Sequence, residues 1–221
     1  MLAKMIALDW RAMKVYQIRG LLLPVFAFLF GLFSPLLVIP MTVYMYLSYS
    51  INPFAVEEKG ELNNLYLTLP VSRKEIVTGR YLLSFLMMLV SMAIGALVMP
   101  VANQFSVSKW FIGLEGYIAV IALSYLLYAI LNLFMFPILF RLGYQKGKFW
   151  GFYLPAILFA FLCSAYISFT TITEYKTLSL DLIRFASENL LVVSGSMAVL
   201  ATIILIISYL IYLKLYAKRD F

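Results

Sequence analysis

The sequence has no histidine, a single cysteine and few charges. Of its 221 residues only 12% are charged, whereas 64% are hydrophobic and the mean hydropathy is +0.97. Because histidine is missing and Cys163 stands alone in an apolar run, disulfide frameworks, Cys/His zinc sites, Ser-His-Asp triads and Cys-His dyads are excluded. We therefore expect no catalytic residue, no metal site and no cofactor in this chain.

The apolar excess predicts an all-α integral membrane protein, because a soluble domain of this composition would expose too much apolar surface to water. Residues 20–56 carry no charge, and this stretch of 37 residues exceeds one span. Ser34-Pro35 near its middle favours a turn. Later charge-free windows are each long enough to cross a bilayer. Six transmembrane helices are predicted at about 18–33, 36–53, 81–104, 116–140, 149–171 and 189–213.

The basic residues set the orientation of these spans. With an even number of spans, 1–19, 57–80, 141–148 and 214–221 share one side of the membrane and hold 4, 4, 3 and 3 Lys/Arg, which sum to 14. The other side holds three, Lys109, Lys176 and Arg184. This bias predicts cytoplasmic N and C termini. It also accounts for the net charge of +7 without a nucleic-acid partner.

The N-terminal residues 1–17 place apolar and basic side chains on different sides of a helix. Leu2, Met5, Ile6 and Trp10 share the apolar side. This pattern is typical of an interfacial helix on the cytoplasmic leaflet, with its basic residues toward anionic lipid. The alternative is a cytosolic extension of the first span. A cleavable signal is not evident, since this stretch is charged and amphipathic.

The longest charged segment, 57–80, joins the second and third predicted spans. Four apolar residues in it follow the i, i+3, i+4, i+7 spacing of one helix face, namely Leu62, Leu65, Tyr66 and Leu69. Glu57, Glu58 and Glu61 are expected in the first turns, where the helix dipole favours carboxylates. Pro70 ends this helix. Ser72 to Glu75 then has the Ser-x-x-Glu form of a capping box, which begins the next helix.

The run from Leu65 to Leu82, LYLTLPVSRKEIVTGRYL, resembles the cytosolic signature of type-2 ATP-binding-cassette (ABC) exporter permeases of the small six-span bacterial kind. In that family the helix before the Leu-Pro-x-Ser-Arg turn is the coupling helix, which sits in a cleft of a separate cytosolic ATPase subunit. The resemblance implies that 57–72 is the coupling segment, and that ATP and Mg are bound by the partner ATPase.

The resemblance assigns two sets of residues in this segment. The ATPase-coupling residues are Glu57, Glu58, Glu61, Leu62, Asn63, Leu65 and Tyr66. The hinge and cap of the next span are Pro70, Ser72, Arg73 and Glu75. The alternative is a membrane-surface helix with no protein partner, but anionic lipid would repel its three glutamates.

The chain carries no nucleotide-binding loop of its own. The nearest lookalike, Gly143 to Phe149, has three residues between its glycines where four are needed, and Phe149 where a Ser or Thr belongs. We interpret 141–148 as a basic cytosolic loop between the fourth and fifth spans. The chain therefore depends on an ATPase outside it.

Two further sets of residues within the spans have candidate roles. Small residues recur every four positions in the fifth span, at Ala156, Ala160, Ser164 and Ser168, which permits close approach of another helix in lipid. They could contact a second permease copy, homologous or identical, or pack within one copy. Polar side chains at Tyr44, Tyr128 and Asn132 could line a cargo pathway, or form hydrogen bonds between helices.

The resemblance implies an exporter in the bacterial cell membrane that moves amphipathic peptides or other hydrophobic cargo outward. It is similar to permeases of phenol-soluble-modulin and bacteriocin-type peptide exporters. The alternative is a non-transporting scaffold or channel-like subunit that docks a cytosolic regulatory protein. An intramembrane enzyme is disfavoured, because the predicted spans lack the usual catalytic histidines and aspartates.

Overall fold

The described part of the chain is helical. The computed structural model describes residues 6–7, 9–11, 17–60, 73–106, 113–155, 157–158, 161, 185 and 188–217, and no strand occurs among them. Its elements are α2 (Gln17–Phe33), the 3-10 turn η2 (Pro35–Leu37), α3 (Val38–Ser50), α4 (Asn52–Gly60), α6 (Arg73–Phe105), α7 (Leu114–Lys148), the π-helical turn η3 (Phe149–Tyr153) and α10 (Leu190–Ala217).

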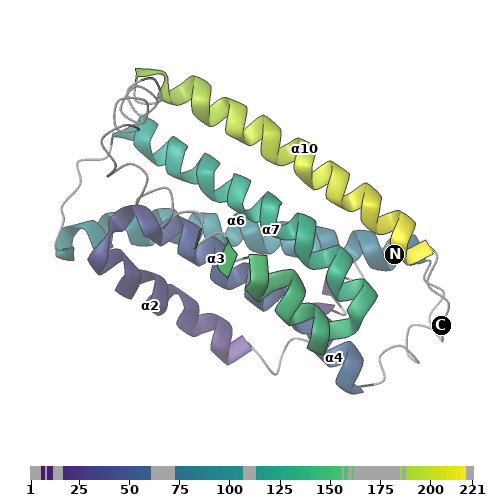
Figure 1. The fold of residues 1–221 in the computed structure, drawn as a ribbon. Coiled ribbons are helices and arrows are strands. Elements are labelled where there is room, and N and C mark those ends of the chain that lie inside the picture. Colours follow the sequence, from purple (N-terminus) through teal and green to yellow (C-terminus); the bar gives the residue numbers. More distant parts are fainter. Residues whose placement is uncertain are drawn as a thin grey trace.

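The long helices lie roughly side by side, and the short α4 lies at one end of the bundle (Figure 1). α3 packs chiefly on α6, with α2 against both of them, and α10 packs chiefly on α7. α3 also contacts α7, and α10 also contacts α6. The bundle therefore consists of two groups of helices, α2/α3/α6 and α7/α10, joined by a smaller number of contacts.

Three described helical stretches are long and apolar enough to cross a membrane, namely Lys74–Phe105, Leu114–Tyr153 and Leu190–Lys214, and Leu22–Phe33 is a shorter apolar helix. α10 exposes large apolar side chains along its length, including Val192, Val199, Ile203 and Leu210. Such a surface is unfavourable in water and suits hydrocarbon. Length, composition and exposure together identify a membrane protein.

The predicted turn at Ser34-Pro35 is confirmed. Ser34 is extended, with φ −151° and ψ 115°, and Pro35 begins the 3-10 turn that leads into α3. A second break follows at Ile51, after which α4 begins at Asn52 with Pro53 in its first turn. Proline is favoured there because the first N–H groups of a helix lack intrahelical acceptors.

This early start of α4 changes the position of two glutamates. Glu57 and Glu58 lie in the second half of α4, not in the first turn of a helix that begins at Glu57. The helix dipole argument therefore does not apply to them, and tertiary contacts hold them in place. The predicted amphipathic stretch and turn from Glu61 to Ser72 lie outside the described residues, as does most of 1–17.

The basic segment 141–148, expected to be a loop, is helical on both sides of Gly143. Gly143 has φ 75° and ψ −179°, a backbone conformation that is essentially restricted to glycine. The chain reverses at this residue. A Cβ atom added to Gly147 would lie 2.8 Å from Leu139 Cα, and one added to Gly151 would lie 3.2 Å from Met135 Cα. We call residues 135–153 the Gly143 hairpin.

The close packing of this hairpin is testable by adding one methyl group. Gly147→Ala places a Cβ against the Leu139 backbone, whereas Gly195→Ala in α10 meets nothing within 4 Å. Both changes improve helix propensity equally, so their difference isolates the steric contact. We expect Gly147→Ala to be less stable than Gly195→Ala by about 1–3 kcal/mol, measured by thermal unfolding in detergent. Equal unfolding midpoint temperatures for Gly147→Ala and Gly195→Ala would contradict the hairpin geometry.

Candidate functional site

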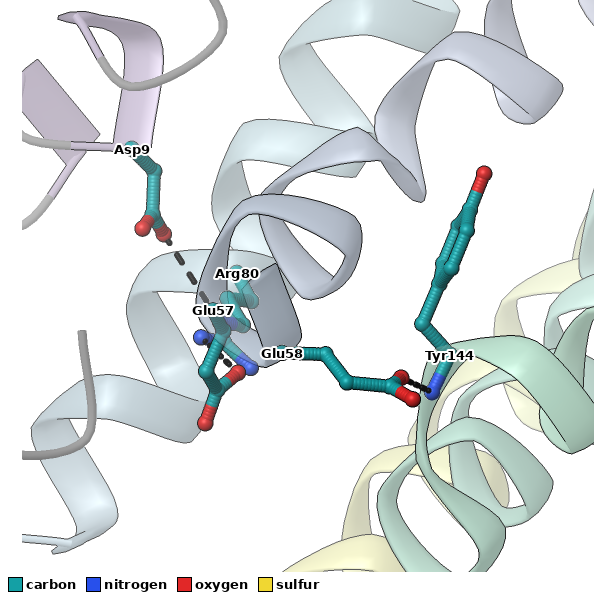
Figure 2. Close-up of polar contacts among 5 residues, drawn as sticks. All are labelled: Asp9, Glu57, Glu58, Arg80 and Tyr144. Atoms are coloured by element: carbon teal, nitrogen blue, oxygen red, sulfur yellow. Dashed lines mark hydrogen bonds and ion pairs between the residues drawn. The ribbon is translucent and has the colours of Figure 1, made fainter. Parts of the chain in front are cut away.

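A buried arginine joins three parts of the chain at the α4 end of the bundle (Figure 2). Arg80, in the second turn of α6, is only 2% exposed. Its Nη2 donates a hydrogen bond to Glu57 Oε2 of α4 at 2.6 Å. Its Nε lies 3.9 Å from Oδ2 of Asp9, which belongs to the N-terminal helical residues 9–11 and is fully buried. One cation therefore holds two carboxylates.

Aromatic rings form the walls around this cation. The guanidinium carbon of Arg80 lies 4.4 Å from the ring centroid of Phe54 in α4 and 5.2 Å from that of Phe140 in α7. The Phe140 ring in turn packs on Tyr212 of α10, with centroids 4.0 Å apart. Arginine stacks favourably on such ring faces. We call Asp9, Phe54, Glu57, Arg80 and Phe140 the Arg80 junction.

The next residue, Glu58, points away from this junction toward the Gly143 hairpin (Figure 2). Its Oε2 accepts hydrogen bonds from the backbone N–H of Tyr144 at 2.6 Å and of Gln145 at 3.2 Å. These N–H groups begin the returning helix, and the unusual backbone of Gly143 leaves them without helical acceptors. A carboxylate satisfies them and complements the helix dipole.

The two glutamates of α4 thus form links of different strength. Removing Glu57 would leave the buried Arg80 charge poorly compensated, which costs about 3–5 kcal/mol for such pairs. Glu58 is exposed, and water can replace it at the two amides. A helix cap of this kind contributes about 1 kcal/mol, less where solvent screens it. The polar link of Glu57 to α6 is therefore firm and that of Glu58 to the hairpin is weak, while Phe54 of α4 also packs on Phe140 with ring centroids 4.3 Å apart.

Hydroxyl pairs connect α6 to its neighbours just beyond the junction. Tyr81 Oη lies 2.6 Å from Ser208 Oγ of α10, and Ser84 Oγ lies 2.9 Å from Tyr128 Oη of α7. Thr78 forms a similar pair with Tyr209 at 2.9 Å. Within a membrane, hydrogen bonds between helices specify their relative positions. A displacement of α6 would therefore disturb its hydrogen bonds with both α7 and α10.

The three candidate cargo residues contribute to packing in this conformation. Tyr128 and Asn132 are buried in the core, at 2% and 0% exposure. The ring of Tyr44 stacks on Phe152 of η3, with centroids 4.8 Å apart. The hydrogen bond of Tyr128 with Ser84 and the stacking of Tyr44 on Phe152 agree with contacts between helices, the alternative that the sequence left open. Their role in cargo transport stays a prediction.

The structure describes part of the coupling segment. Arg73 begins α6 and Glu75 lies in its first turn, directly after the hinge predicted at Pro70. The remaining coupling and cap residues lie outside the described residues, namely Glu61, Leu62, Asn63, Leu65, Tyr66, Pro70 and Ser72. So do the candidate dimer contacts Ala156, Ala160, Ser164 and Ser168. Their roles also stay predictions.

Sequence reasoning did not anticipate the Arg80 junction or the Glu58 cap. It assigned both glutamates to the ATPase-coupling segment. One signal for the hairpin was available, since Gly143, Gly147 and Gly151 recur every four residues, a spacing that allows close helix approach in membranes. Nothing in the sequence pairs Glu58 with residues 86 positions away.

Comparison with known proteins gives one relevant match. The family model described as ABC-2 family transporter protein matches residues 1–217 of the chain. Neither the curated proteins nor the solved structures give a match.

The Arg80 junction makes a stability prediction. Glu57→Ala should lower the free energy of unfolding by about 3 kcal/mol or more, because the Arg80 charge stays buried. Glu115→Ala, a change at an exposed glutamate at the start of α7, should alter it by less than about 0.5 kcal/mol. Size-exclusion chromatography after graded heating in detergent measures both.

A further variant separates charge burial from packing. Replacing all three charged residues together, with Asp9→Leu, Glu57→Leu and Arg80→Met, should recover most of the lost stability, because the ion pairs described in the junction are removed as a whole and none of their charges is left buried. If Glu57→Ala is as mild as Glu115→Ala, the junction does not carry the energy assigned to it.

Proposed function

The chain belongs to the ABC-2 transporter family, and from this premise we propose that it is an exporter permease. A separate cytosolic ATPase binds the segment 57–72 and thereby moves the permease. The family supplies the membrane subunit of ABC transporters and not the ATPase, so this chain is a permease subunit and its complex includes an ATPase partner. ATP and Mg belong to that partner.

The observation that supports this coupling route is the Arg80 junction. α4 extends to Gly60, inside the segment 57–72 predicted to bind the ATPase, and Glu57 ties α4 to α6 inside the bundle. A force applied beyond Gly60 would therefore reach a spanning helix through a buried ion pair. On this proposal Glu61, Leu62 and Tyr66 face the ATPase, while Glu57 and Glu58 hold the base of the segment.

The proposed topology has six spans in the bacterial cell membrane, with both termini in the cytoplasm. The positive-inside bias supports this orientation. The arrangement of the bundle is compatible with it, since α4, the beginning of α6, the Gly143 turn and the end of α10 lie at one end (Figure 1). These are the parts that the charge count assigns to the cytoplasm.

The complex is proposed to contain two permeases, identical or related, that contact each other through the fifth span. Its cargo is proposed to be an amphipathic peptide or another hydrophobic molecule. Support for this cargo comes from the resemblance to peptide exporters and from the abundance of aromatic residues, 17% of the chain. Movement of helices as rigid bodies would alternate access between the two sides.

The ATPase contact is tested by co-purification and transport. Glu61→Arg and Tyr66→Ala, alone and together, should reduce recovery of the cognate ATPase with the permease by about tenfold, as expected when a charged contact and an aromatic anchor are lost from an interface. ATP-dependent efflux of a fluorescent amphipathic peptide from cells should fall in parallel.

Glu115→Arg, on the opposite side of the proposed topology, is the matched control and should leave both readouts unchanged. Survival of ATPase recovery and efflux in the Glu61→Arg/Tyr66→Ala double variant would refute the coupling assignment. Normal ATPase recovery without efflux in the unmodified complex would favour the scaffold alternative.

A further inference from the structure

We propose that Glu58 is a detachable positioning residue, which caps the Gly143 hairpin in the conformation described and releases it when the ATPase moves α4. This inference rests on the proposed function and deepens it. It states which contact between α4 and the bundle breaks during the transport cycle and which persists.

Two adjacent carboxylates of α4 bind to different groups of helices. Glu57 reaches Arg80 on α6, which packs with α2 and α3. Glu58 reaches the amides of Tyr144 and Gln145 in the hairpin, which continues α7 and packs with α10. α4 therefore bridges the boundary between the two groups. Phe54 of α4 also packs on Phe140 of the hairpin, with ring centroids 4.3 Å apart, so relative movement of the groups strains this contact as well as the two polar links.

The burial of the two links decides which one breaks. Glu57 is 9% exposed and Arg80 is 2% exposed, so separating them would leave a charge among the rings of Phe54 and Phe140. Glu58 and Gln145 are exposed, so water can take over both the carboxylate and the freed amides. Of the two polar links the Glu58 link therefore opens first, while Glu57 stays paired with Arg80.

The hairpin itself stays intact during this movement. Gly147 and Gly151 bring its returning arm against Leu139 and Met135 at backbone contact distance, and an added Cβ at Gly147 would not fit. The Gly143 backbone sets the reversal independently of Glu58. Release of Glu58 therefore uncovers two amides without unfolding the arm, and the hairpin remains part of the α7/α10 group.

Hydrogen exchange of these amides tests the proposal in the complete complex. The permease with its ATPase, in lipid nanodiscs, is compared without nucleotide and after trapping with ATP and vanadate. Peptides covering 141–148 should exchange about fivefold faster at Tyr144 and Gln145 in the trapped state, the change expected when a helix cap is lost. Peptides covering 76–84 around Arg80 should keep their protection.

Three variants separate a detachable cap from a static one. In Glu58→Ala, the amides of Tyr144 and Gln145 should exchange rapidly both with and without nucleotide. Glu58→Gln keeps an oxygen acceptor and should restore protection in the nucleotide-free state. Glu115→Ala alters an exposed glutamate at the other end of α7 and should behave as the unmodified chain.

Equal protection in both nucleotide states, with the ATPase bound and hydrolysing ATP, would overturn the proposal, since a merely structural cap gives that result. Protection of these amides in Glu58→Ala would overturn it as well. Failure of the unmodified permease to retain the ATPase would instead overturn the proposed function, and this inference with it.

Discussion

A buried cation at the edge of the helix bundle constrains the rest of the structure. Among the described residues, the Arg80 side chain of α6 is enclosed by two carboxylates and two aromatic rings contributed by three other parts of the chain, residues 9–11, α4 and α7. A charge in such surroundings is tolerated only while its partners stay in place. The position of α4, and hence of the segment that follows it, depends on this requirement.

Membrane surroundings make that requirement stricter. α6, α7 and α10 present apolar side chains outward, and no hydrophobic driving force holds such helices together in lipid. Their relative positions depend instead on close packing, as in the Gly143 hairpin, and on polar contacts such as those of Tyr81 and Ser84. The strongest polar contact among the described residues lies beside the proposed attachment of the ATPase.

The geometry suits transmission of force because the two glutamates of α4 differ in burial. A helix held equally on both sides could move only with the whole bundle, whereas one held firmly by Glu57 and weakly by Glu58 can shift at the hairpin amides and stay paired with Arg80. α4 then stays bound to Arg80 through Glu57 and can detach from the hairpin amides at Glu58. Transport by a small membrane subunit requires discrete rearrangements of this kind.

The sequence by itself determined the membrane character, the approximate positions of the described long helices, the turn at Ser34-Pro35 and, through residues 65–82, the family. These follow from local properties, since apolar length, charge-free windows and turn residues act within one stretch of chain. The Arg80 junction and the Glu58 cap were decided only by the tertiary structure. Glu57 and Arg80 are 23 residues apart, and Glu58 and Tyr144 are 86 apart. No local pattern pairs such positions, because their proximity depends on how α4 packs between the helix groups and on the reversal at Gly143.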